Sequence, residues 1–182
     1  MKKIYLIRHA LPDFPDGKRL CLGSTDIPLG EEGRAQAARM AQCLPPVTAV
    51  FSSPLSRALH TARAIGQPVQ ILDGLRELHM GEWDGRSFEE IRVRYPALYA
   101  ARGKDLSIPM PGAEPDEAGL ERFTAALELA AATAPGDLAV VTHGGITSRF
   151  LGAHCGLPRK PGYTEIIALN WDNGIFTLEE SI

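Results

Sequence analysis

The sequence predicts an α/β protein in which a mostly parallel central sheet is flanked by helices. Three short, mainly apolar runs, at residues 4–9, 49–52 and 138–142, have the pattern of strands buried on both faces of a parallel sheet. Segments of helical character separate these runs, and such alternation indicates right-handed strand–helix–strand crossovers. The chain has 182 residues, and at roughly 150 residues per domain this length predicts one domain spanning 1–182.

Five helices are expected between and after these strands. Ser53-Pro54 has the form of an N-cap followed by proline at the first helical position. Ser87 and Glu90 have the spacing of a capping box, and the helix that they open should stop before Pro96. The expected helices cover residues 31–44, 55–65, 87–95, 117–133 and 147–155.

The end of the chain alternates apolar and polar residues in the manner of strands over 163–178. Asp172-Asn173-Gly174 lies within this segment and has the composition of a hairpin turn. We therefore expect an antiparallel strand pair at the end of the fold.

Composition and charge exclude several classes of protein. Hydrophobic residues make up 45% of the chain and charged residues 23%, with a net charge of −3, which argues against disorder and against a nucleic-acid partner. Three widely spaced cysteines, Cys21, Cys43 and Cys155, form neither a disulfide framework nor a zinc motif, so a reducing compartment is expected. The apolar run after Met1 is too short for a signal peptide, and no run approaches a membrane span. We expect a soluble cytoplasmic protein with no membrane partner.

Two histidines fall where a sheet of this kind binds ligands. His9 ends the first predicted strand and His143 follows the 138–142 strand, and the carboxyl ends of parallel strands share one edge of a sheet. Gly144-Gly145 should expose backbone amides at a helix start, where anions bind. Arg8 and Arg57 would add guanidinium groups to the same crevice. Imidazoles and guanidiniums suit phosphate rather than a metal cation, so no metal site is expected.

The common phosphate-handling motifs are absent. The chain contains no GxxxxGK[ST] loop and no cysteine followed six residues later by arginine, which excludes P-loop kinases and cysteine-dependent phosphatases. A GxSxG motif is also missing, which weakens a serine hydrolase interpretation. Histidine remains as a nucleophile, because a neutral imidazole nitrogen can attack phosphorus and hold the phosphoryl group covalently.

Three segments resemble the signatures of the histidine phosphatase (phosphoglycerate mutase-like) superfamily. They are LIRH at 6–9, SSPLSRA at 52–58 and VTHGG at 141–145, in the family's order and spanning nearly the whole chain. RELHMGEWDG at 76–85 and PGAE at 111–114 resemble its small-phosphatase branch, closest to the α-ribazole phosphatases and broad-specificity members. The resemblance implies a phosphoglycerate mutase-like fold with a small cap insertion at about 77–116.

The resemblance also implies roles for individual residues. His9 would be the phosphorylated nucleophile, and Arg8, Arg57 and His143 would bind the phosphoryl oxygens and stabilise the charge that spreads during transfer. Glu77 would be the proton donor to the leaving group and would then activate water. These groups neutralise the phosphate, so no cofactor is implied.

Two further substrate contacts follow from position. Gly144 opens the helix after the second histidine, and Ser24 lies in a loop that resembles the family's pocket-lining segment. Other positions depart from the family: Ala10-Leu11-Pro12 replace a glycine and polar residues, and Ser148 stands where an arginine is often found, with Arg149 next. Specificity or rate should differ accordingly.

Three functions compete at this point. The first is a phosphomonoesterase of a small phosphorylated metabolite, with α-ribazole 5′-phosphate as the first specific candidate and a sugar phosphate or broad activity close behind. The second is a cofactor-dependent phosphoglycerate mutase, and the third is a phosphate-binding module without turnover. The mutase ranks well below hydrolysis because the residues after Glu77 differ from the mutase pattern. The oligomeric state is not fixed, and a monomer or homodimer is expected.

Overall fold

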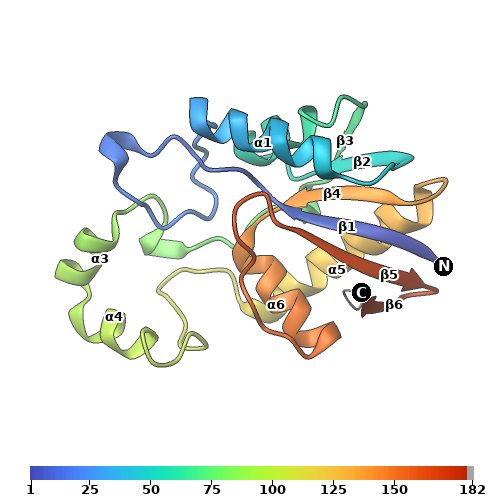
Figure 1. Cartoon of the computed structure of the whole chain (residues 1–182). Coiled ribbons are helices and arrows are strands. Elements are labelled where there is room, and N and C mark those ends of the chain that lie inside the picture. Colours follow the sequence, from blue (N-terminus) through green and yellow to red (C-terminus); the bar gives the residue numbers. More distant parts are fainter. Residues whose placement is uncertain (180–182) are drawn as a thin grey trace.

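A computed structural model describes residues 1–179 and contains, over that range, a six-stranded sheet with strand order β3-β2-β4-β1-β5-β6 (Figure 1). Neighbouring strands from β3 to β1 run parallel, whereas β5 and β6 are antiparallel to their neighbours. The α/β class with a mostly parallel sheet is therefore confirmed. The strands are β1 (Lys2–Arg8), β2 (Ala49–Ser52), β3 (Val69–Ile71), β4 (Leu138–Thr142), β5 (Ile166–Asp172) and β6 (Ile175–Leu178).

All five predicted helices are present within the described residues, together with one further α-helix. The capping box of Ser87 and Glu90 forms as expected. Pro96 ends the helix before it and then occupies the first turn of a further helix that the sequence analysis missed. The helices are α1 (Glu31–Cys43), α2 (Ser56–Arg63), α3 (Phe88–Arg94), α4 (Pro96–Arg102), α5 (Asp116–Thr133) and α6 (Gly144–Cys155).

The predicted start of α2 is wrong. Leu55, not Ser53, precedes the helix, and no side chain caps it. The Ser53 hydroxyl accepts a hydrogen bond from the Leu55 amide at 3.3 Å and contacts the ring of His143 at 2.7 Å. Ser53 therefore belongs to the site at the sheet edge.

The sheet buries both of its faces, which explains the continuous apolar runs. Ile4 and Leu6 of β1 pack with α5 and α6 on one face, whereas Ile7 packs with Met40 of α1 and Ala58 of α2 on the other. Figure 1 shows these helix pairs on opposite sides of the strands. Alternation along each strand thus sends apolar side chains into two separate core clusters.

Pairing of β1 with β4 fixes the position of the two histidines. Arg8 is in register with Thr142, and the His9 amide donates to the Thr142 carbonyl at 2.9 Å. His9 and His143 therefore emerge side by side at the carboxyl edge, as the sequence predicts.

A second, smaller unit lies beyond this edge. Figure 1 shows α3 and α4 set apart from the sheet on the side where β1 and β4 end. Trp83 and Ile91 form a separate apolar cluster there with Cys21, which comes from the loop after β1. Of the helices within 1–179, none has the length and apolar character needed to cross a bilayer.

Candidate active site

His9 is buried and holds a defined tautomer. Its Nδ1 lies 2.7 Å from the Ala10 carbonyl oxygen, which can only accept, so Nδ1 carries the proton and Nε2 keeps a free lone pair. Burial, together with the Arg57 guanidinium, holds the pKa of His9 well below its ordinary value of 6.5. The ring is therefore neutral at neutral pH and presents a nucleophilic nitrogen.

His143 lies against His9, with ring centroids 5.1 Å apart. Its Nε2 is 2.7 Å from the Ser53 hydroxyl oxygen, which already accepts from the Leu55 amide. If the Ser53 hydroxyl donates to Nε2, the proton of the ring resides on Nδ1. Burial and the nearby Arg57 guanidinium hold the pKa of His143 well below its ordinary value.

Arg57 is fully buried at the start of α2. Its guanidinium donates to the carbonyls of Thr25 and Gly23, each at 2.8 Å. Asp84 holds this loop by accepting from the amides of Gly23, Ser24 and Thr25. Burial lowers the pKa of Arg57, but arginine remains charged in proteins. The carbonyls of the loop after β1 therefore hold the Arg57 guanidinium in place at the carboxyl edge of the sheet.

Arg8 approaches from the end of β1. One guanidinium nitrogen donates to the Pro161 carbonyl at 2.8 Å, and the group lies 3.8 Å from the centre of the Tyr163 ring. Tyr163 also contacts His9, with ring centroids 5.6 Å apart. Stacking and the carbonyl contact restrict Arg8 to one orientation.

Three buried nitrogens around His9 have no hydrogen-bond partner within residues 1–179. They are Nε of Arg8, Nε of Arg57 and Nδ1 of His143. Buried polar groups are nearly always paired, because an unpaired one costs about 1–3 kcal/mol. The arrangement therefore suits an anion with several acceptor oxygens beside the free Nε2 of His9.

Glu77 is buried, and its carboxyl group lies against the start of α6. Its Oε2 accepts from the Gly145 amide at 2.8 Å, and Oε1 accepts from the amides of Ile146 and Leu78 at 2.7 and 3.1 Å. The amides of Gly145 and Ile146 therefore hold the Glu77 carboxyl group, which corrects the expectation that they bind an external anion. The helix also begins at Gly144, three residues earlier than predicted.

The other predicted contacts occupy distinct places. Ser24 is exposed, and its amide is one of those that Asp84 holds. Gly144 leaves room for its neighbours, since a Cβ there would lie 3.0 Å from Nε of Arg8 and 2.8 Å from Cε of Lys160. Lys160 thus runs across the start of α6 toward the site, and burial lowers its pKa although part of the side chain is exposed.

Ala10 fits without strain at the position where the family usually has glycine. Ala10 does not have positive φ, and it packs in a small apolar cluster with Leu29 and Ala37. Its amide donates to the Thr61 hydroxyl at 3.0 Å. Thr61 in turn donates to the Arg57 carbonyl at 2.7 Å, which ties the first turn of α2 to the segment after His9.

Several contributing residues escaped the sequence analysis. The sequence predicts Ser53 as a helix cap, and Thr61, Tyr163 and Lys160 carry no pattern that distinguishes them. Asp84 lies within the RELHMGEWDG segment, which was the one available signal. No group of three or more His, Cys, Asp or Glu side chains in the part of the chain described here is arranged to hold a metal ion.

Comparison with known proteins identifies the family. A model of the histidine phosphatase superfamily (branch 1) matches residues 4–180. The chain belongs to this superfamily. The resemblance inferred from the three signature segments is thereby confirmed.

Proteins similar in sequence carry different names. A glucosyl-3-phosphoglycerate phosphatase of Mycolicibacterium vanbaalenii is 31% identical over 173 residues, covering 87% of this chain and 76% of that protein. Phosphoglycerate mutase-like protein 4 of Arabidopsis thaliana is 32% identical over 156 residues, covering 79% and 67%. The alignment thus extends over most of each chain.

Solved structures agree with the fold. A mycobacterial glucosyl-3-phosphoglycerate phosphatase complexed with VO3 superposes with a TM-score of 0.86 at 25% identity, covering 98% of both chains. The α-ribazole phosphatase of Shigella flexneri gives 0.81 at 25% identity, covering 97% of this chain and 94% of that one. The phosphoglycerate mutase-like architecture is therefore confirmed.

Proposed function

We propose that this histidine phosphatase family member is a metal-independent phosphomonoesterase that transfers a phosphoryl group from a small metabolite to His9 and then to water. One observation carries the proposal: the neutral His9 ring keeps a free Nε2 beside three buried nitrogens that have no hydrogen-bond partner within residues 1–179. A neutral nucleophile next to anion-binding donors suits attack on a phosphate ester.

In the first step the lone pair on His9 Nε2 forms a bond to phosphorus while the bond from phosphorus to the ester oxygen breaks. The ring then carries a positive charge, which the Ala10 carbonyl stabilises through the Nδ1 proton. Arg8, Arg57 and His143 bind the phosphoryl oxygens.

Glu77 gives its proton to the departing oxygen in that step. Its Oε2 accepts one amide hydrogen bond and Oε1 accepts two, so Oε2 is the oxygen with capacity to carry the proton. In the second step water attacks phosphorus, Glu77 takes the proton of that water, and the nitrogen–phosphorus bond breaks. Inorganic phosphate leaves and the neutral His9 ring is restored.

The substrate belongs, in this proposal, to the small phosphorylated metabolites. Relatives named for glucosyl-3-phosphoglycerate and for α-ribazole support these two compounds as the first to test. Gly144, at the start of α6, and Ser24, in the loop fixed by Asp84, are the proposed further substrate contacts.

A panel of phosphomonoesters tests the proposal. Phosphate release is measured with a chelator present from nitrophenyl phosphate, α-ribazole 5′-phosphate, glucosyl-3-phosphoglycerate, 3-phosphoglycerate and phosphoserine, with His9→Ala as control. Chelator-resistant release that His9→Ala abolishes supports the phosphatase. One substrate at least about tenfold above the others in kcat/KM, or about 1.4 kcal/mol in the barrier, would name the reaction.

Negative outcomes are equally informative. Release that the chelator abolishes would contradict metal independence, and release that survives in His9→Ala would contradict the nucleophile. No release from any compound, with isomerisation of 3-phosphoglycerate in the presence of bisphosphoglycerate, would favour a mutase. Phosphate binding without either activity would favour the binding module.

A further inference from the structure

The loop that carries Glu77 is held by an ion pair that lies outside the site. Arg122, on α5, donates to both carboxylate oxygens of Glu114 through Nε at 3.0 Å and Nη2 at 2.9 Å. The side chains of Arg122 and Glu114 are 16% and 15% exposed, so the pair is largely shielded from water. A two-pronged contact of this kind fixes orientation as well as distance.

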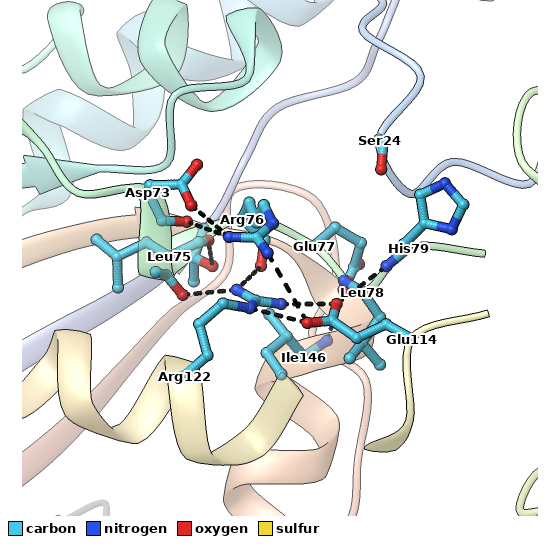
Figure 2. A network of polar contacts seen from close by, with 12 residues as sticks. Ser24, Asp73, Leu75, Arg76, Glu77, Leu78, His79, Glu114, Arg122 and Ile146 are labelled. Atoms are coloured by element: carbon cyan, nitrogen blue, oxygen red, sulfur yellow. Dashed lines mark hydrogen bonds and ion pairs between the residues drawn. The ribbon is translucent and has the colours of Figure 1, made fainter. Parts of the chain in front are cut away.

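The side chains of Arg122 and Glu114 also form hydrogen bonds with the backbone on both sides of Glu77. The second terminal nitrogen of Arg122, Nη1, donates to the carbonyls of Gly74 at 2.7 Å and Arg76 at 3.0 Å. On the other side, Glu114 accepts from the His79 amide at 3.2 Å, and its own amide donates to the His79 carbonyl at 2.9 Å. Figure 2 shows these contacts converging on the segment that includes Glu77.

Packing reinforces this attachment to α5. A Cβ at Gly119 would lie 2.2 Å from the Leu78 side chain, so Leu78 sits directly on the helix at that glycine. A Cβ at Gly74 would lie 2.6 Å from the Ala126 side chain, which places the start of the segment against the same helix. Both flanks of Glu77 therefore rest on α5 while its carboxylate reaches the start of α6.

We propose that the Glu114–Arg122 pair is a positioning device that sets the Glu77 carboxylate against the leaving group. The inference rests on the proposed function of Glu77 as the acid. Neither partner needs to touch substrate, because these hydrogen bonds direct Arg122 and Glu114 to each other and to the loop backbone.

Displacement of the Glu77 carboxyl group should slow only those substrates whose leaving group needs a proton. Proton transfer requires the acid within hydrogen-bond reach of the departing oxygen, and a displacement of about 1 Å can cost about 100-fold in rate. Nitrophenolate leaves without a proton, so a displaced acid affects nitrophenyl phosphate little. A purely structural role for the pair would lower both reactions together.

The test compares an alkyl phosphate with nitrophenyl phosphate in Glu114→Gln and Arg122→Lys. The first variant keeps the shape but places an amide NH2 against donors, and the second keeps the charge but loses the fork. We expect kcat/KM for the alkyl ester to fall at least about tenfold and that for nitrophenyl phosphate to stay within about twofold. Equal losses on both substrates, or no loss on either, would overturn the proposal.

Asp116→Asn is the matched control. Asp116 is close in sequence to Glu114 and pairs with Arg149 at 2.6 Å, and within residues 1–179 neither side chain makes a hydrogen bond or ion pair to residues 74–79. Loss of this ion pair should leave the ratio of the two rates unchanged. A shift in that ratio as large as in Glu114→Gln would contradict a specific positioning role.

Glu77→Gln separates failure of this inference from failure of the proposed function. If Glu77→Gln itself shows no selective loss on the alkyl ester, the acid assignment fails. If it does, and Glu114→Gln adds no further loss in the Glu77→Gln background, positioning through Glu77 is supported. An undiminished additional loss in the double variant would refute coupling through Glu77.

Discussion

The two buried histidines should make folding stability depend on pH in a range where few other groups titrate. His9 is 5% exposed and His143 is fully buried, and burial holds the pKa of each well below 6.5. In the unfolded chain both titrate near the ordinary value. As the pH falls below about 6.5, the unfolded chain therefore binds protons that the folded protein excludes.

These two histidines make the folded protein less stable at low pH. Stability is fully present above about pH 6.5 and is lost as the pH falls toward the folded-state pKa values. One proton of differential uptake corresponds to about 1.4 kcal/mol per pH unit, so the two histidines together approach about 2.7 kcal/mol per unit near pH 5.5. A loss of this size is a large fraction of the stability of an ordinary domain.

Urea denaturation at closely spaced pH values between about 5 and 7, in buffers without phosphate, measures the slope. His9→Asn and His143→Asn should each reduce it by about one proton, or about half. A flat stability profile between about pH 6.5 and 5.5, or an unchanged slope in both variants, would refute the neutral, buried state of these rings and with it the basis for nucleophilic attack.

Three further variants probe the site. In Gly145→Ala the new methyl would lie 2.8 Å from Glu77 Oε1, so the rate of alkyl phosphate hydrolysis should fall at least about tenfold while that of nitrophenyl phosphate changes little. Equal rates of variant and wild type on the alkyl ester would contradict the placement of the acid. Ser53→Ala removes the hydrogen-bond partner of His143 Nε2 and should lower the free energy of unfolding, measured by urea denaturation, by about 1–3 kcal/mol. An unchanged free energy of unfolding would show that the contact between Ser53 and His143 is dispensable. Lys160→Met removes a cation that lowers the pKa of His9, so the acid limb of the pH profile of kcat/KM should move to higher pH. An acid limb that does not move would contradict this influence of Lys160 on His9.

The sheet was predictable because burial on both faces leaves a continuous apolar run. Residues 138–142 and 49–52 coincide with β4 and β2 for that reason. β3 lacked such a signal, since Val69 is only half buried and its two successors are exposed. Glycine is a poor helix former, so the true start of α6 at Gly144 was missed.

The core of the site was predictable to the extent that strands position it. His9 and His143 follow paired strands, and Arg8 ends β1, so their convergence follows from sheet topology. Arg57 could be placed there because it follows a predicted strand at the start of a helix, whereas Glu77 could be named only through the family resemblance. The structure brings all five together.

The supporting residues could not be predicted because they depend on how loops close on one another. Asp84 reaches a loop some sixty positions away in the chain, and Ser53 meets His143 across an even longer separation. Tyr163 and Lys160 come from an irregular segment before β5. Such contacts leave no periodic trace in the sequence.

Trapping the covalent intermediate tests the central claim most directly. The wild-type protein is mixed briefly with a substrate labelled in its phosphoryl group, denatured in alkali to preserve phosphohistidine, and mapped by peptide analysis. If His9 is the nucleophile, an acid-labile phosphoryl group is found on His9 and is absent from His9→Asn. Substrate turnover with no label on His9 at any time point, or label on another residue, would contradict the mechanism.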